Sequence, residues 1–242
     1  MKLRIILLGL AVKVALLGVQ TAHAAESVKA LPAKKLTPDP VLDSNTRMLL
    51  KSIAERYKAL GNWSATFQQK TFSTGLGKGT DNEGRFTFQG PNKFRYSLLG
   101  SEASDFVSDG KSAWHIVYRE GRAKPADVKH FVSVKGLELE RYLILLKGLG
   151  TNEKKLLEDF VVKARKQDQA IELELQPKKS AEISKIVLVF KNDSQAPYRA
   201  VMEDAIGNTT TVNIGSYESN KKTDPKIFQP DYPKGSKVEI FQ

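Results

Sequence analysis

The sequence predicts an α+β fold in which one large antiparallel sheet has an apolar face covered by helices. Three observations support this. Apolar and polar residues alternate with a period of two through most of residues 63–218. The chain shows about eleven such segments but no alternation of strands with helices, which argues against a parallel sheet. Helical spacing is confined to two main segments. A sheet of that size must curl or split into two sheets.

Residues 1–24 are typical of an export signal. Lys2 and Arg4 precede an apolar run over residues 5–17, and Ala22-His23-Ala24 matches a small-x-small cleavage motif. The alternative is an uncleaved membrane anchor, but the run is short for a bilayer span and contains Lys13. We expect cleavage after Ala24, a flexible Lys- and Pro-rich tether over residues 25–42, and one folded domain over residues 43–242.

The first element of that domain is a helix over residues 43–60. Its apolar residues recur at helical spacing, with charged residues between them. Ser44 is the expected N-cap, and Gly61 is the expected stop. The apolar positions are Leu49, Leu50, Ile53, Tyr57 and Leu60.

Strand patterns begin at Trp63. The glycine-rich stretch Thr74–Gly84 is expected to be a flexible connection, and Asp109-Gly110 is expected to form a hairpin turn. The predicted strands follow in order around Phe67, Phe86, Phe94, Phe106, Trp114 and Val128, and then over residues 160–165, 170–176, 183–191, 198–204 and 209–218.

Residues 137–149 interrupt this pattern. Leu, Tyr and Ile fill most of Tyr142–Leu146, between Gly136 and Gly148. A helix that is apolar on almost every side is buried or lies over another apolar surface.

Composition excludes several functions. The 242 residues include no cysteine, so a disulfide scaffold, a thiol nucleophile and a lipid-modified cysteine are excluded. The three histidines show no metal-ligand spacing, and no G-x-S-x-G motif is present. We therefore predict no catalytic residues, no metal and no cofactor. Asp105, Asp109, Asp193 and Asp204 lie beside turn or strand-end signals, where aspartate is ordinary.

The net charge of +11 falls to +8 without the signal segment, which carries three basic residues and no acid. Nucleic acid is scarce outside the cell, so an anionic membrane surface or an ordinary solvated surface explains this charge better. The aromatic sheet face, with the apolar helix, indicates either a dry core or a cavity for an apolar ligand.

Several segments resemble the family of the periplasmic lipoprotein carrier LolA. Ser64–Gln69 resembles the family's entry strand, and Gly84–Phe88 with Pro91–Tyr96 resembles its next hairpin. Val107–Lys111 with Trp114 resembles the following turn and strand. Phe228-Gln229-Pro230 and Pro233–Val238 resemble the family's ending, and order and spacing match over most of the mature chain.

This resemblance implies an unclosed antiparallel β-barrel of about eleven strands, with helices covering its apolar concave face. It implies a monomeric periplasmic carrier, not an enzyme, that binds the acyl chains of lipoproteins. An inner-membrane ABC transporter would load it, and the receptor LolB, if present, or the outer membrane would accept the cargo. The expected lining residues are Phe67, Phe86, Phe88, Phe94, Tyr96, Leu98, Trp114, Ile116, Leu143, Ile144 and Leu146.

One position departs from the family pattern. An arginine usually precedes the Pro-Asn pair and latches the covering helices, but this chain has Gly90 there. The alternatives to a lipoprotein carrier are a related lipid- or glycolipid-binding or sensing protein of the same fold, an exported hydrolase that uses carboxylates, and an interaction module with a dry core.

Overall fold

The computed structural model describes residues 42–90, 92–100, 102–134, 153–179, 182–220 and 222–242. The predicted signal peptide, almost all of the tether and the apolar segment 137–149 lie outside these residues. No helix in the described part of the chain is long and apolar enough to cross a membrane.

Twelve strands form a single unclosed sheet in the order β12-β6-β5-β4-β3-β2-β1-β11-β10-β9-β8-β7. Neighbouring strands are antiparallel throughout, except that β12 pairs with β6 in parallel. The strands are β1 (Trp63–Ser73), β2 (Lys78–Gln89), β3 (Lys93–Leu99), β4 (Ser104–Asp109), β5 (Ala113–Val117), β6 (Asp127–Phe131), β7 (Phe160–Gln167), β8 (Ala170–Pro177), β9 (Ile183–Lys191), β10 (Arg199–Asp204), β11 (Thr209–Ser219) and β12 (Lys237–Phe241). The predicted unclosed antiparallel barrel is confirmed, and the described residues are mostly strand, with few helices.

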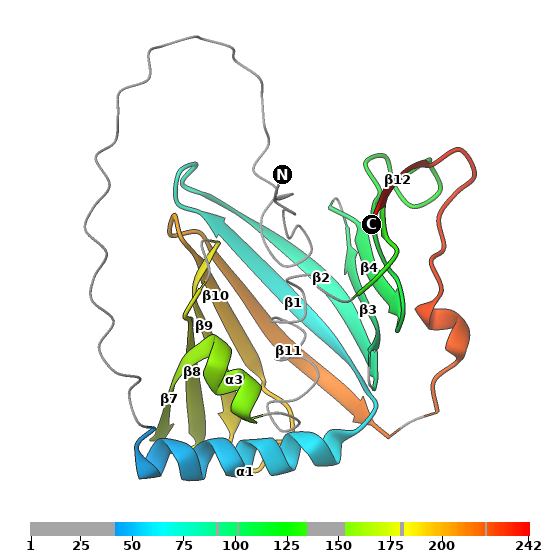
Figure 1. The fold of residues 1–242 in the computed structure, drawn as a ribbon. Helices are drawn as coiled ribbons and strands as arrows, with labels where there is room; N and C mark the ends of the chain where they lie inside the picture. The colour runs from blue at the N-terminus through cyan, green and yellow to red at the C-terminus, as the bar shows by residue number, and fades with distance from the viewer. Residues whose placement is uncertain (1–41, 91, 101, 135–152, 180–181, 221) are drawn as a thin grey trace.

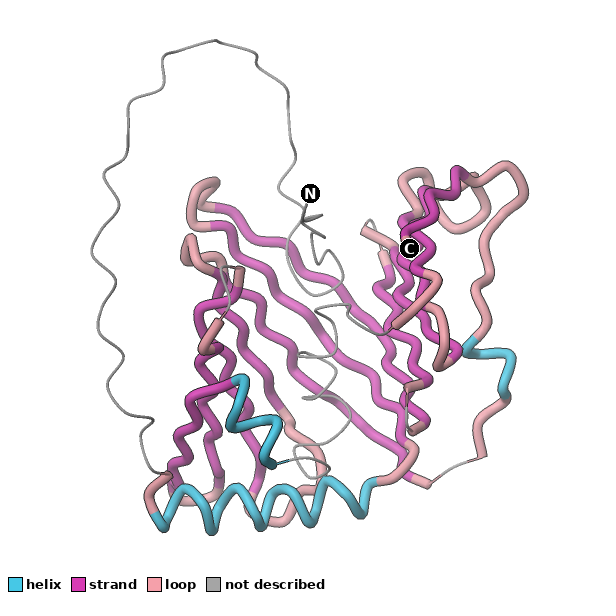
Figure 2. Tube along the Cα trace, viewed as in Figure 1, coloured by secondary structure: helices cyan, strands magenta, loops and turns pink. Residues whose placement is uncertain are grey.

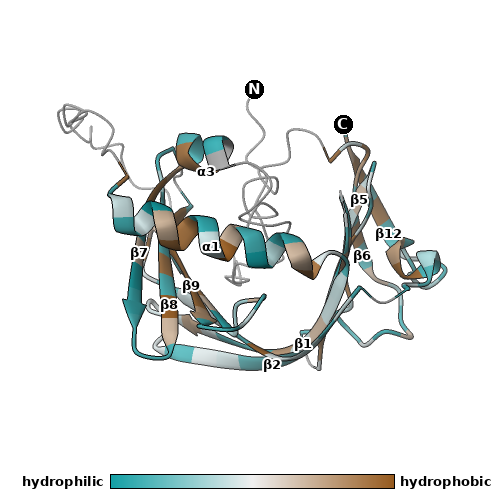
Figure 3. Ribbon diagram, turned by 90° about the horizontal axis from the view of Figure 1, so that it is seen from below, coloured by the Kyte–Doolittle hydropathy of each residue, from teal (hydrophilic) through white to brown (hydrophobic). Residues whose placement is uncertain are grey.

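The sheet is strongly curved and encloses a trough. Seen from below, it forms a U, and helix α1 (Ser44–Leu60) lies across the opening of that U (Figure 3). In the side view α1 runs along one end of the strands, and the β1–β2 turn projects at the other end (Figure 1). A short helix, α3 (Glu153–Asp159), precedes β7 and lies on the same side of the sheet (Figure 2).

The start of α1 differs by one residue from the prediction. Asp43, not Ser44, is the N-cap, because its backbone is extended and its carboxylate accepts the Thr46 N–H at 2.9 Å. The predicted apolar face is buried, and Gly61 ends the helix with a φ of 60°. Thr46 also accepts the Ala164 N–H at 3.3 Å, which fixes α1 against β7.

The β1–β2 hairpin is longer than the glycine pattern predicts. Residues 78–84, expected in a flexible connection, form the first half of β2 and pair in register with β1. Gly84 faces Phe67 across the two strands, and a Cβ there would lie 2.1 Å from the Phe67 ring. The glycine is thus required by close packing within a regular strand.

Buried apolar residues form two clusters, one on each side of the sheet. The larger cluster lies on the concave side and includes the inner face of α1. The smaller cluster lies on the convex side, around Val107, Trp114 and Ile116, with Tyr232 packed against it. The C-terminal segment passes along this outer side as the 3₁₀ helix η1 (Pro225–Phe228) and then joins the edge of the sheet as β12, beside β6 (Figure 1). The sequence analysis did not anticipate β12.

Candidate functional site

The concave face carries a continuous set of aromatic side chains. Residues directly opposite each other on neighbouring strands point to the same face, and Phe86, Tyr96 and Phe106 are paired in this way across β2, β3 and β4. Phe88 faces Phe94 in the next row. The rings contact one another closely. Their centroids lie 4.6 Å apart for Phe67–Tyr96, 5.0 Å for Trp63–Phe86 and 5.1 Å for Phe94–Phe106.

One buried polar contact interrupts this apolar surface. The Tyr96 hydroxyl donates to Gln69 Oε1 at 2.6 Å, and both side chains are buried. Burial raises the pKa of Tyr96, so the phenol remains protonated and stays a donor. Farther along the hairpin, Asn82 Nδ2 donates to Glu102 at 3.0 Å. The concave face is therefore apolar near α1 and becomes polar toward the β1–β2 turn.

Arg56 holds α1 in place over this face. Its Nη1 lies 3.4, 2.6 and 3.2 Å from the carbonyl oxygens of Lys191, Asn192 and Ser194, at the end of β9 and in the turn after it. The next residue, Tyr57, lies on the buried face of the helix and packs edge-on against Trp63, with ring centroids 6.3 Å apart. The sequence analysis missed Arg56, because nothing in the local pattern distinguishes it from the solvated charges beside it.

The structure divides the predicted lining residues into three groups. Phe67, Phe86, Phe88, Phe94, Tyr96 and Leu98 all belong to the concave cluster. Trp114 and Ile116 belong to the convex cluster, so the structure separates them from the first six. The reason is strand register: Phe106 faces His115, which puts Trp114 and Ile116 on the opposite side of β5. Leu143, Ile144 and Leu146 lie outside the described residues.

The convex face carries a charged cluster that the sequence analysis also missed. Asp105 is completely buried within β4, not at a turn. Its carboxylate accepts hydrogen bonds from Arg95 at 2.6 Å, from Arg122 at 2.8 and 3.0 Å, and from Tyr118 at 3.1 Å. Arg95 Nη1 also donates to the carbonyls of Ile227 and Gln229. The cluster therefore fastens the C-terminal segment to the outside of the sheet.

The charges around Asp105 set its ionisation. Burial raises the pKa of its carboxyl, but hydrogen bonds from Arg122 and Ser97, with the charge of Arg95, outweigh burial and leave the pKa lowered. Burial and the neighbouring Asp105 charge raise the pKa of Tyr118 to about 12. Asp105 thus remains an anion and Tyr118 a neutral hydrogen-bond donor. The carboxylate can therefore accept the hydrogen bonds of Tyr118 and of both arginines.

Gly90 has no side chain that could act as the latch that the family's arginine provides, although there is open space around it. Gly90 lies exposed after β2, and a Cβ built on it would have no atom within 4 Å. Among the described residues, no group of three or more histidines, aspartates or glutamates could hold a metal ion.

The sequence of most of the domain identifies its family. The model of the outer membrane lipoprotein carrier protein LolA matches residues 59–231, more than two thirds of the chain. The chain belongs to the LolA family. Carriers of the LolA family are non-enzymatic. A comparison with characterised protein sequences finds no match.

Solved structures with a similar fold are distant from this chain. A LolA superfamily protein, NE2245 from Nitrosomonas europaea, is 12% identical over 75% of this chain and 97% of its own, with a TM-score of 0.39. MucB in the MucA/MucB complex of Pseudomonas aeruginosa is 11% identical, with a TM-score of 0.41; the match covers 78% of this chain and 62% of that one. These values are too low to transfer a function.

Proposed function

We propose that this LolA-family protein is a periplasmic carrier that binds the acyl chains of lipoproteins released from the inner membrane and delivers them to the outer membrane. The observation that carries the proposal is the aromatic concave face, which α1 crosses at one end of the strands. An ABC transporter would load the carrier, and a LolB-type receptor or the outer membrane itself would accept the cargo.

The energetics favour such a surface. A triacylated anchor has about 45 methylenes, and exposing them to water costs on the order of 35 kcal/mol at ~0.8 kcal/mol each. Recovering all of this energy would exceed the practical limit of about 18–21 kcal/mol for non-covalent binding, and the cargo would not be released. The concave rings already contact one another, so an entering acyl chain replaces existing contacts. The smaller net gain favours release of the cargo at the outer membrane without ATP.

Photocrosslinking tests where the acyl chain binds. Benzoylphenylalanine placed at Phe88 on the concave face should attach to a bound palmitoyl chain, because benzophenone inserts into nearby C–H bonds. The matched control is benzoylphenylalanine at Trp114, an aromatic residue of similar burial on the convex side. Intact mass should show the lipid adduct only at position 88. Adducts only at position 114, or at neither position, would contradict the proposal.

A second experiment separates a lipoprotein carrier from a related lipid-binding or sensing protein. Depletion of a lipoprotein carrier should cause lipoproteins to accumulate in the inner membrane. Mass spectrometry of lipids that co-purify with the exported protein should find acylated cargo. Normal lipoprotein sorting after depletion, combined with a bound glycolipid, would favour the alternative.

A further inference from the structure

The convex side of the sheet is hollowed beside the C-terminal segment. A cleft of about 860 Å³ opens over β1, β2, β3 and β11 and is walled by Ile227 of η1. A second hollow of about 430 Å³ continues toward Lys222, and the two share Thr66, Arg85 and Ile227. They therefore form one groove on the side of the sheet opposite α1. This outer groove shares Ala65, Phe67 and Ile214 with the concave cluster, but its polar lining is separate.

The charged residues of the outer groove leave an excess of positive charge. Arg85, Arg95 and Arg122 line the larger hollow together with Glu83. The buried carboxylate of Asp105 accepts hydrogen bonds from both Arg95 and Arg122, so one carboxylate offsets two guanidinium groups. Arg85 is exposed, and no ion pair of Arg85 is formed with the described residues. Glu218 and Lys222 in the smaller hollow balance each other.

Apolar surface lies beside these charges. Leu99 is 45% exposed although it lines the groove, and Ile227 is half-buried there. Side-chain hydroxyls and amides, among them Thr66, Gln68, Ser97 and Asn213, supply hydrogen-bonding groups along the floor. A concave site with an apolar wall and a few convergent polar groups is the usual form of a small-ligand site.

We propose that the outer groove binds a small amphipathic anion, a phosphate or carboxylate joined to a short apolar chain. The anion would pair with Arg85, the guanidinium without a described carboxylate partner, because a guanidinium offers a planar set of donors that matches both anions. The apolar chain would lie against Leu99 and Ile227. This site is additional to the acyl-binding face proposed above and does not depend on it.

Titration with octyl phosphate, octanoate and octanol tests the site in the full mature chain. With methyl-labelled isoleucine and leucine, both anions should shift the NMR signals of Ile227 and Leu99, while Ile53 and Leu98 on the concave side report on the other face. Octanol lacks the charge and should bind at least tenfold more weakly. The two anion arms show whether phosphate or carboxylate is preferred.

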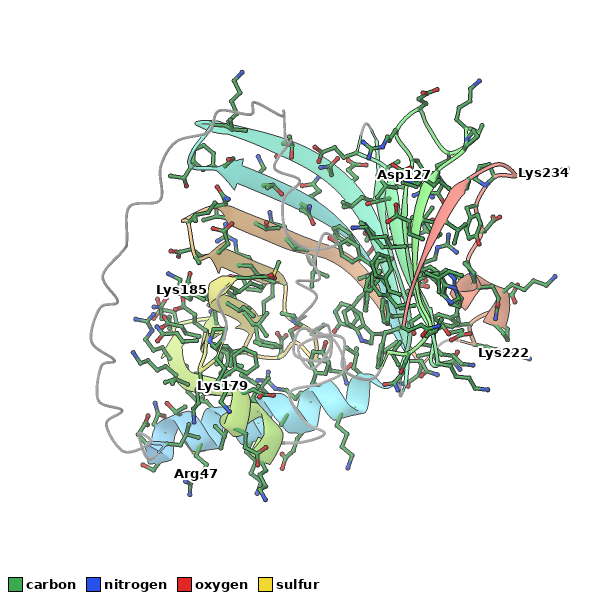
Figure 4. All side chains as sticks on the ribbon, turned by 45° about the horizontal axis from the view of Figure 1, so that its top comes forward. Arg47, Asp127, Lys179, Lys185, Lys222 and Lys234 are labelled. Carbon is green, nitrogen blue, oxygen red and sulfur yellow. The ribbon has the colours of Figure 1, made fainter. Side chains whose placement is uncertain are left out.

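Substitution of Arg85 provides the decisive comparison. Arg85→Gln should weaken octyl phosphate binding at least fivefold, whereas Arg47→Gln, an exposed arginine on α1 far from Lys222 in Figure 4, should leave it unchanged. Because Arg85 is exposed, the variant should fold, and its thermal midpoint checks this. Equal binding of octanol and octyl phosphate, shifts confined to Ile53 and Leu98, or unchanged affinity in Arg85→Gln would each overturn the proposal.

Discussion

At the residue scale, a few side chains fix how the sheet packs on its two sides. Gly84 provides the space that the Phe67 ring occupies, so Phe67 can stack on Tyr96 on the concave side. Asp105 organises the packing on the convex side, because its carboxylate forms ion pairs with Arg95 and Arg122. Neither role follows from residue type, since glycine and aspartate are both common in turns.

The close contact at Gly84 predicts that alanine destabilises the protein at position 84 but not at position 90. In Gly84→Ala the new Cβ would meet Phe67 at 2.1 Å and the Ser97 carbonyl at 2.6 Å, so Phe67 must move. We expect a loss of about 1–3 kcal/mol in the free energy of unfolding, typical of overpacking, and weaker acyl binding. The control Gly90→Ala has open space and should be nearly neutral. Urea unfolding of the two variants measures the difference, and equal stability would contradict it.

The Asp105 cluster predicts sensitivity to acid. Because the folded-state pKa of Asp105 is lowered, its stabilising effect is present above the unfolded value of about 4 and disappears as the pH falls through the lower folded value. Asp105→Asn should lose roughly 3–5 kcal/mol at pH 7, as expected when one partner of a buried pair is removed. It should also flatten the decline in stability below pH 4. The exposed Lys70–Asp81 pair provides a control, because Asp81→Asn should change stability little.

At the element scale, α1 is held by its two faces. Its apolar face packs on the concave cluster, and its side toward β9 and β10 is fixed by Arg56 through three carbonyl oxygens. The helix is therefore held in a fixed position across the trough. The β1–β2 hairpin, in contrast, extends away from α1, and Thr74 is bonded to Gly207 and Asn208 in the neighbouring turn.

Removal of the Arg56 contact should loosen α1 selectively. Arg56→Ala leaves those carbonyls without the charged donor, and a charge-assisted hydrogen bond contributes about 1.5–3 kcal/mol. We expect faster amide exchange over residues 44–60, with smaller changes in β1 and β2. Arg47→Ala, an exposed substitution on the same helix, should show no such change. Uniform acceleration across the sheet would mean that Arg56 stabilises the whole fold and not the helix alone.

At the scale of the whole molecule, an open sheet presents two surfaces of different character. The concave side holds the aromatic rings, and the convex side holds the C-terminal segment and the charged cluster. Phe228 is 1% exposed, so η1 is packed firmly enough to define one wall of the outer groove.

Acyl binding should stabilise the folded protein. A ligand present at 100 times its Kd adds about 2.7 kcal/mol to the folded state. In a domain of this size that corresponds to a rise of roughly 5–10 °C in Tm. Differential scanning calorimetry with a long-chain lysophospholipid should show this rise, and glycerophosphocholine, which has the same headgroup without a chain, should have no effect. An unchanged Tm with the lysophospholipid would contradict a cavity and favour a dry core.

The sequence by itself determined the fold class, most strand positions and the helix, which it predicted over residues 43–60. Each of these follows from a local period, because burial on one face leaves a repeat of two or 3.6 in the chain. Tertiary structure decided what depends on partners distant in sequence. Register placed Trp114 and Ile116 on the convex side, and burial made Asp105 the centre of a charged cluster. A period shows that alternate residues share a face, but only strand pairing decides which face lies inside the trough.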